Sequence, residues 1–218
     1  MALAIFDLDN TLIAGDSDHS WGEFLAVNGK VDRDYYRVMN DRFYADYEAG
    51  CLDINAYLNF SLAPLAEIPM AELQQLHQKF LHEIITPMML SKAQTLLATH
   101  RKSGDHLLVI TSTNRFIVEP ICNALGIDDL IATELEIIDG NYTGRFSGTP
   151  TFREGKVERF NQWLVEHPEH SGESYFYSDS INDLPLLLEV EIPIAVDPDD
   201  ALRDEANNRN WEIISLRD

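Results

Sequence analysis

Short apolar runs that end in polar residues recur along this chain and restrict what it can fold into. They occupy residues 3–6, 107–110, 175–177, 192–196 and 211–214. Continuous apolar runs of this length are typical of strands buried on both faces of a parallel sheet. Helical patterns lie between them, as where Ile117, Ile121 and Leu125 share one face before Gly126. Strands alternating with helices predict an α/β fold with a doubly wound, Rossmann-like parallel sheet.

One long segment, residues 16–86, breaks this alternation. It shows helical patterns and no convincing strand, and one helical face is formed by Leu73, Leu76, Phe80 and Ile84. The segment is too long for an ordinary loop. We therefore predict a small helical cap at 16–86, inserted into a core made of 1–15 and 87–218. A β-hairpin is also predicted within 131–152, because Asp-Gly-Asn lies at its centre.

The charge balance limits the partners of this chain. Asp and Glu total 37 against 16 Lys and Arg, which gives a formal net charge of −21. Such a surface repels nucleic acids and anionic membranes, so the expected partner is a small molecule. Cys51 and Cys122 show no metal-site spacing, and we expect two free, buried thiols. The N-terminus lacks the basic region of a signal peptide, which favours a cytoplasmic enzyme.

Polar side chains follow the predicted strands, where open α/β sheets bind their ligands. The first run is followed by Asp7, Asp9, Asn10 and Thr11, the second by Thr111, Ser112, Thr113 and Asn114, and the third by Ser178, Asp179, Ser180, Asn182 and Asp183. Lys156 begins a predicted helix directly after Gly155. If these strands are neighbours, four carboxylates, two or three hydroxyls and one Lys meet in one crevice.

Carboxylates this close together cannot all stay ionised without a counter-charge. A hard divalent cation with oxygen ligands is the natural answer, and Mg²⁺ commonly takes one or two carboxylates plus a substrate phosphate. A carboxylate can also attack phosphorus and form an aspartyl-phosphate. That chemistry needs a second acid, which protonates the leaving group and later activates water.

The order of these residues resembles the haloacid dehalogenase superfamily. Residues 7–11 read Asp-Leu-Asp-Asn-Thr and match its first motif, DxDxT. Ser112 matches the second motif, Lys156 the third, and the acidic pair Asp179 and Asp183 the fourth. DxDxT alone is a weak signal, but four motifs in order cover nearly the whole chain.

The resemblance implies the chemical roles. Asp7 would be the nucleophile and a metal ligand. Asp9 would be the general acid and base and would bind the metal through its backbone carbonyl. Asp179 would complete the protein ligands of Mg²⁺.

The resemblance also implies roles for the supporting residues. Ser112 and Lys156 would hold the phosphoryl oxygens, and Asn182 would contact phosphate or substrate. Thr11 would orient the motif loop. Asp183 would be a nearby ligand or an acid that supports the ligands.

The helical insert is similar to the cap of the phosphoserine-phosphatase-like group, whose nearest members include histidinol phosphatases. In that group a cap carboxylate binds the substrate ammonium and a cap Arg binds its carboxylate. Asp16 falls at the carboxylate position, but Ser61 stands where the Arg is expected, and no Lys or Arg occurs between Arg42 and Lys79. A substrate carboxylate would therefore lack its bidentate partner.

These departures favour an amine-bearing phosphate ester, with L-histidinol phosphate preferred to phosphoserine because it has an amine, an imidazole and no carboxylate. Asp18 and Glu23 would also suit a cation, although each alone is interpreted as a solvated charge. Two alternatives remain open. One is a phosphotransferase that passes the phosphoryl group to an alcohol, and the other is a regulatory binding protein phosphorylated on Asp. Receiver domains lack a second acid at the position of Asp9.

Overall fold

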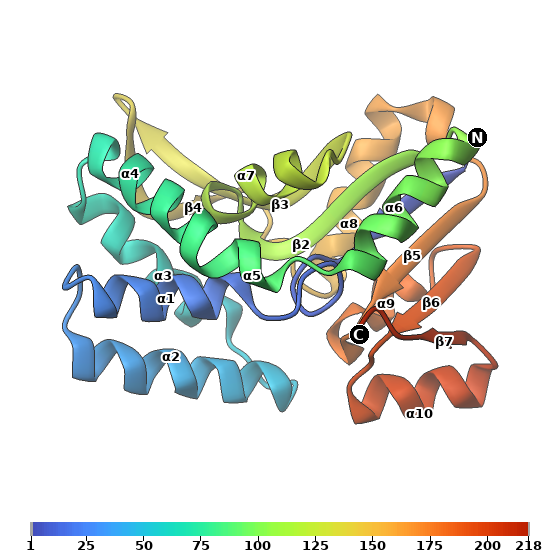
Figure 1. Ribbon diagram of the computed structural model, residues 1–218, viewed down its shortest axis with the longest axis horizontal. Helices are drawn as coiled ribbons and strands as arrows, with labels where there is room; N and C mark the ends of the chain where they lie inside the picture. The colour runs from blue at the N-terminus through green and yellow to red at the C-terminus, as the bar shows by residue number, and fades with distance from the viewer. Residues whose placement is uncertain (1, 218) are drawn as a thin grey trace.

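A computed structural model describes residues 2–217, and within them seven strands form one sheet (Figure 1). The strands are β1 (Leu3–Phe6), β2 (His106–Asn114), β3 (Asp129–Ile138), β4 (Asn141–Ser147), β5 (Ser174–Ser178), β6 (Ile192–Val196) and β7 (Glu212–Ile214). Their order is β4-β3-β2-β1-β5-β6-β7, and every neighbouring pair is parallel except β3 and β4. The predicted α/β class with a mostly parallel sheet is confirmed.

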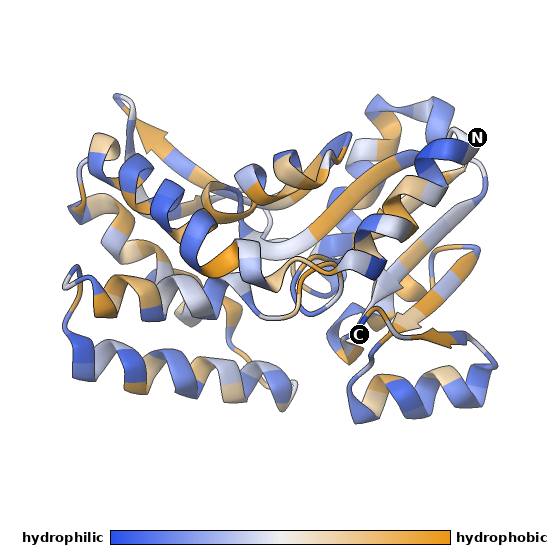
Figure 2. Ribbon diagram, in the orientation of Figure 1, coloured by the Kyte–Doolittle hydropathy of each residue, from blue (hydrophilic) through white to orange (hydrophobic). Residues whose placement is uncertain are grey.

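Helices cover both faces of the sheet. Alternate side chains of each strand point to opposite faces, so the apolar strands place hydrophobic side chains on both faces, and both are covered. Ala4 and Phe6 pack in a cluster with α6 (Ser91–Ser103) and α7 (Arg115–Leu125). Leu3 and Ile5 pack in another cluster with residues of the remaining core helices, which are α8 (Glu154–Glu166), α9 (Leu184–Leu187) and α10 (Asp200–Arg209). Figure 2 shows α10 as mainly hydrophilic, consistent with an outer helix that buries one narrow stripe.

The segment predicted as a cap is helical. It contains α1 (Ser17–Val27), α2 (Arg33–Glu48), α3 (Ile54–Glu67) and α4 (Met70–Phe80), followed by η1 (Leu81–Ile85) and α5 (Thr86–Met88). The side chains of Asp16, Asp32 and Asp53 accept backbone hydrogen bonds at the starts of α1, α2 and α3, as N-cap residues do. Figure 1 shows these helices at one end of the molecule and β5–β7 at the other.

One hydrophobic cluster joins this helical segment to the sheet. Trp21, Leu58 and Phe80 belong to the same cluster as Phe6 and Ile117. The helices are therefore packed onto one face of the core through shared apolar contacts. The division into a core of 1–15 and 87–218 and a cap of 16–86 stays a prediction.

The predicted hairpin is present, with Asp139 and Gly140 at positive φ in the turn between β3 and β4. The sequence missed the first half of β3, which pairs in parallel with β2. That half is buried at Ile131, Ala132 and Thr133, but its apolar run is only Leu130–Ala132, between the polar Asp129 and Thr133. The hairpin packs on α3, and Gly144 lies close to Ala66 there.

Two further expectations need correction. Strand β2 does not end at Ile110 but continues to Asn114, with a register shift against β3 between these residues. Both thiols are free, but Cys51 is exposed and only Cys122 is buried. Among residues 2–217 no helix is long and apolar enough to cross a membrane.

Candidate active site

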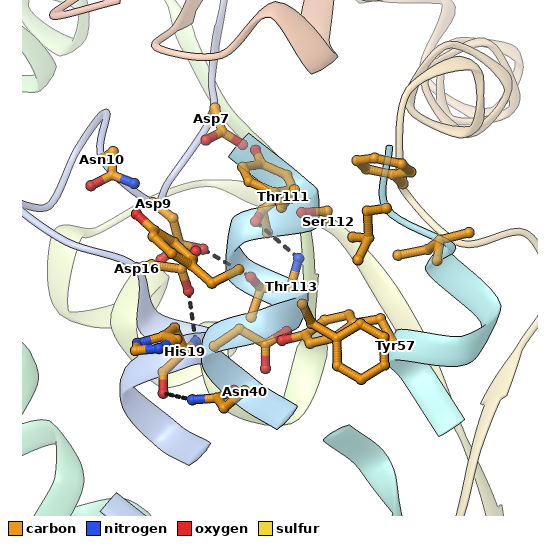
Figure 3. Close-up of a pocket in the computed structure, with 17 residues that line it drawn as sticks. Asp7, Asp9, Asn10, Asp16, His19, Asn40, Tyr57, Thr111, Ser112 and Thr113 are labelled. Carbon is orange, nitrogen blue, oxygen red and sulfur yellow. Dashed lines mark hydrogen bonds between the residues drawn. The ribbon is translucent and has the colours of Figure 1, made fainter. Parts of the chain in front are cut away.

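A pocket lies beyond the carboxyl ends of the central strands. Strand β1 sits between β2 and β5, so the chain order reverses there and leaves a crevice of the kind that binds ligands in α/β sheets. The pocket is lined from the sheet by Asp7, Asp9 and Thr111 and from the helical segment by residues such as Asp16 and Tyr57 (Figure 3). The chain thus brings the first-motif acids and the predicted cap against one cavity.

Lys156 lies buried between two carboxylates. Its Nζ is 2.7 Å from Asp7 Oδ1 and 2.7 Å from Asp183 Oδ1, and the lysine is 2% exposed. Burial lowers the pKa of Lys156, but Asp183 and Asp7 outweigh this and raise it above its usual range. The Ser178 hydroxyl donates to Asp183 Oδ2 at 2.7 Å and orients that partner. Lys156 is therefore a fixed positive charge beside Asp7.

Gly155 is needed for this placement of Lys156. A Cβ at position 155 would lie 2.0 Å from the backbone oxygen of Pro150. Backbone cannot yield as a flexible side chain would, so Gly155→Ala should displace the start of α8. We expect the free energy of unfolding to fall by about 1–3 kcal/mol, the usual range for overpacking, measured by urea denaturation.

Gly172→Ala is the matched control for that substitution. An added Cβ at Gly172 meets no atom within 4 Å. Equal stability of the two alanine variants would contradict the role given to Gly155.

Asp9 is held by two hydrogen bonds that the sequence did not predict. Its Oδ1 accepts from the backbone N–H of Ser17 at 2.6 Å. Its Oδ2 accepts from the Thr113 hydroxyl at 2.8 Å, and Asp9 and Thr113 lie side by side in Figure 3. Burial, and next the nearby charge of Asp16, raise the pKa of Asp9 to about 7. A carboxyl group with this pKa can donate and accept a proton near neutral pH.

Asp179 lies close to Asp7 and Asp183. Thr11 donates to Asp179 Oδ1 at 3.0 Å, which links the first motif to the fourth. Burial, followed by the charges of Asp7 and Asp183, raises the pKa of Asp179 well above its usual range. Lys156 is a single cation against the buried carboxylates of Asp7 and Asp183 and the half-buried carboxylate of Asp179, so this site has an excess of negative charge.

The residues present fit a divalent cation. Burial raises the pKa of Asp7 to about 7 even with Lys156 beside it, so a further cation would favour its ionised carboxylate. In the described part of the chain, no three His, Cys, Asp or Glu side chains gather as a metal site. The predicted ligand set contains only two carboxylates, those of Asp7 and Asp179, because its third protein ligand would be the backbone oxygen of Asp9. Hard oxygen donors with positions left for water or phosphate suit Mg²⁺.

Ser112 and Asn182, both predicted to hold phosphate, lie in different surroundings. Ser112 lines the pocket near the end of β2. The Asn182 side chain instead accepts from Arg153 Nε at 3.0 Å and donates to the backbone oxygen of Tyr47 at 3.1 Å. Arg153 also donates to the backbone oxygen of Gly50. Asn182 thus connects the end of α2 to the loop before α8, a contact no sequence pattern indicated.

Asp16 and Asp18 both line the pocket from the start of α1. Asp16 is half-buried, and its Oδ1 accepts from the backbone N–H of His19 at 2.7 Å (Figure 3). Asp18 is only 8% exposed, so its interpretation as a solvated charge is wrong. It shares the buried face of α1 with Trp21 and Leu25 at helical spacing, a signal that could have identified it.

The pattern of the haloacid dehalogenase-like hydrolase family matches residues 4–188. A histidinol-phosphatase of Neisseria meningitidis serogroup C (strain 8013) is 48% identical over 219 residues, covering 99% of each chain. A crystal structure of a Bordetella pertussis Tohama I protein of unknown function is 43% identical with a TM-score of 0.92, covering 99% of this chain and 98% of that one.

A structure of a phospho-aspartyl intermediate analogue of phosphoserine phosphatase shares the fold. It has a TM-score of 0.73 and 17% identity, covering 99% of this chain and 93% of that one. With the ordered motifs and the buried site they form, these matches establish the family. The chain belongs to the haloacid dehalogenase-like hydrolase family and is a phosphatase of that family.

Proposed function

We propose that this phosphatase hydrolyses a small amine-bearing phosphate monoester through an aspartyl-phosphate on Asp7, with Mg²⁺ as cofactor. An Asp7 oxygen attacks phosphorus, the ester P–O bond breaks, and Asp9 gives its proton to the leaving alkoxide. Asp9 then takes a proton from water, which attacks phosphorus and releases phosphate from Asp7. The observation that carries this proposal is the buried ion pair of Lys156 with Asp7, an acid that lines the pocket together with Asp9.

The phosphoryl group needs positive charge that this acidic chain supplies locally. Lys156 and the Ser112 hydroxyl would hold phosphoryl oxygens. The Asp7 and Asp179 carboxylates and the Asp9 carbonyl would bind Mg²⁺, which when bound offsets the charge of phosphate and carboxylates. Thr11 and Asp183 would orient Asp179 and Lys156. We assign Asn182 a structural role rather than a phosphate contact, because its side-chain oxygen already accepts hydrogen bonds from Arg153.

The charge of the pocket indicates the substrate class. Four carboxylates line it, from Asp7, Asp9, Asp16 and Asp18, and none of the lining residues identified in the described structure is Lys or Arg. A substrate carboxylate would face these acids without a cationic partner, whereas an amine would find one at Asp16. L-histidinol phosphate is therefore favoured over phosphoserine, and the name of the Neisseria relative supports that preference.

Phosphate release from the two esters, measured with and without Mg²⁺, tests this function. We expect release to require Mg²⁺ and kcat/KM to be at least about tenfold higher for L-histidinol phosphate, because one charged hydrogen bond is worth about 1.5–3 kcal/mol. A preference for phosphoserine would contradict the proposed substrate. Release of inorganic phosphate without an added alcohol distinguishes hydrolysis from phosphotransfer.

A further inference from the structure

The two pocket carboxylates on α1 differ in their surroundings. The Asp16 side chain caps the helix, and its charge is the one that most raises the pKa of Asp9, so it lies near the catalytic acid. Asp18 is more buried and faces α3, where the Tyr57 hydroxyl donates a hydrogen bond to it. No Lys, Arg or His of residues 2–217 forms an ion pair with Asp18. The pocket therefore holds a buried acid with no cationic partner of its own.

The capping of α1 does not require this burial. An unpaired buried carboxylate is costly, and burial raises the pKa of Asp18 to about 7, with only the Tyr57 hydrogen bond opposing it. The cap of α1 is already supplied by Asp16. The matching position in the first turn of α2 is Asp34, which is exposed. The start of a helix thus needs no buried acid. A ligand that reaches Asp18 would account for the burial of its carboxylate.

The walls near Asp18 are aromatic. Phe43, Tyr44 and Tyr57 line the same pocket. Tyr57 is half-buried, and the partial loss of solvent around its hydroxyl raises the pKa of that group well above the usual range. Aromatic faces beside a carboxylate favour a flat cation or a ring with N–H donors. Asp16 is placed for an amine near the reacting ester, so Asp18 is available to a second nitrogen group of the same substrate.

We propose that Asp18 and Tyr57 form a second substrate subsite, which binds an N–H-bearing ring of the imidazole type while Asp16 binds the amine. This inference rests on the proposed function, because it divides the recognition of one amine-bearing ester between two acids. It predicts that the enzyme distinguishes an ester with both groups from an ester with the amine alone.

The test compares kcat/KM for L-histidinol phosphate with kcat/KM for O-phosphoethanolamine, which has the amine and no ring. The ratio is kcat/KM for L-histidinol phosphate divided by kcat/KM for O-phosphoethanolamine. Asp18→Asn should lower this ratio about 10–100-fold, since the substitution removes one charged hydrogen bond to the ring. Asp16→Asn should lower both values together and change the ratio by less than about threefold. The exposed matched control, Asp34→Asn, should change neither value.

A second measurement separates recognition from a structural role. Because Asp18→Asn removes an unpaired buried charge and keeps the side-chain shape, it should raise the melting temperature of the ligand-free protein. A lower melting temperature together with an unchanged ratio would overturn the subsite. If Asp18→Asn leaves the ratio unchanged while the wild-type enzyme prefers L-histidinol phosphate, the subsite alone is overturned. If the wild-type enzyme prefers phosphoserine, the proposed function is overturned together with the subsite.

Discussion

Replacing Lys156 with Met should lower the free energy of unfolding by about 3–5 kcal/mol, the usual effect of removing one partner from a buried ion pair. The change leaves Asp7 and Asp183 buried without the ammonium that lies 2.7 Å from each. It also removes the cation proposed to hold the phosphoryl group, so phosphate release should fall by several orders of magnitude. Urea denaturation and steady-state phosphate release measure the two effects.

The stability loss of Lys156→Met should depend on pH, because it arises from buried carboxylates that have lost their counter-charge. Burial raises the pKa of Asp7, and Lys156 opposes that shift. Without Lys156, the native state holds Asp7 protonated at a pH where the unfolded chain ionises it. Stability of the variant then falls as pH rises above about 4, the ordinary carboxyl pKa. The deficit relative to wild type should therefore be smaller near pH 5 than at pH 7. Lys102→Met, at an exposed helix position, is the control, and a Lys156→Met protein as stable as this control would contradict the buried charge network.

Replacing Asp7 with Asn should reduce phosphate release by at least about 10⁴-fold while leaving the protein folded. The amide keeps the shape of the side chain but is a poor nucleophile, and loss of a nucleophile alone can remove nearly all the catalysis that depends on it. Lys156 keeps Asp183 as a partner, so the core loses no cation and the fold should survive. Steady-state phosphate release with saturating ester, alongside the unfolding midpoint, measures both.

Asp204→Asn offers a matched control for the Asp7 variant, because Asp204 is exposed on α10. It should retain wild-type turnover. If the Asp7 variant kept more than about 1% of that turnover, a different residue or an activated water would have to perform the attack, since nucleophile loss removes most catalysis.

The sequence was most informative where apolar runs end. The run before Asp7 marks a buried strand, and the acids that follow it lie at the sheet edge where the pocket is found. Gly155 before Lys156 likewise marked a helix start that reaches the same edge. These predictions needed only local pattern and the rule that parallel strands share one carboxyl edge.

Contacts between distant parts of the chain could not be read in the same way. Thr113 holds Asp9 from 104 residues away, and only the pairing of β1 with β2 brings them together. Arg153 binds Asn182 and the end of α2 through a loop whose path no periodicity describes. Asp18 was misjudged for another reason: its acidity suggested solvent, although its helical spacing with Trp21 placed it inside.

The covalent step on Asp7 can be tested with Asp9→Asn and para-nitrophenyl phosphate. The nitrophenolate leaving group needs no proton, so attack by Asp7 should proceed, while hydrolysis of the aspartyl-phosphate should slow without the base. We predict a rapid burst of nitrophenolate of about one equivalent per active site, as expected when a covalent intermediate accumulates. Borohydride reduction followed by mass spectrometry should place the trapped acyl phosphate on Asp7. A slow reaction with no burst and no modified Asp7 would contradict the account.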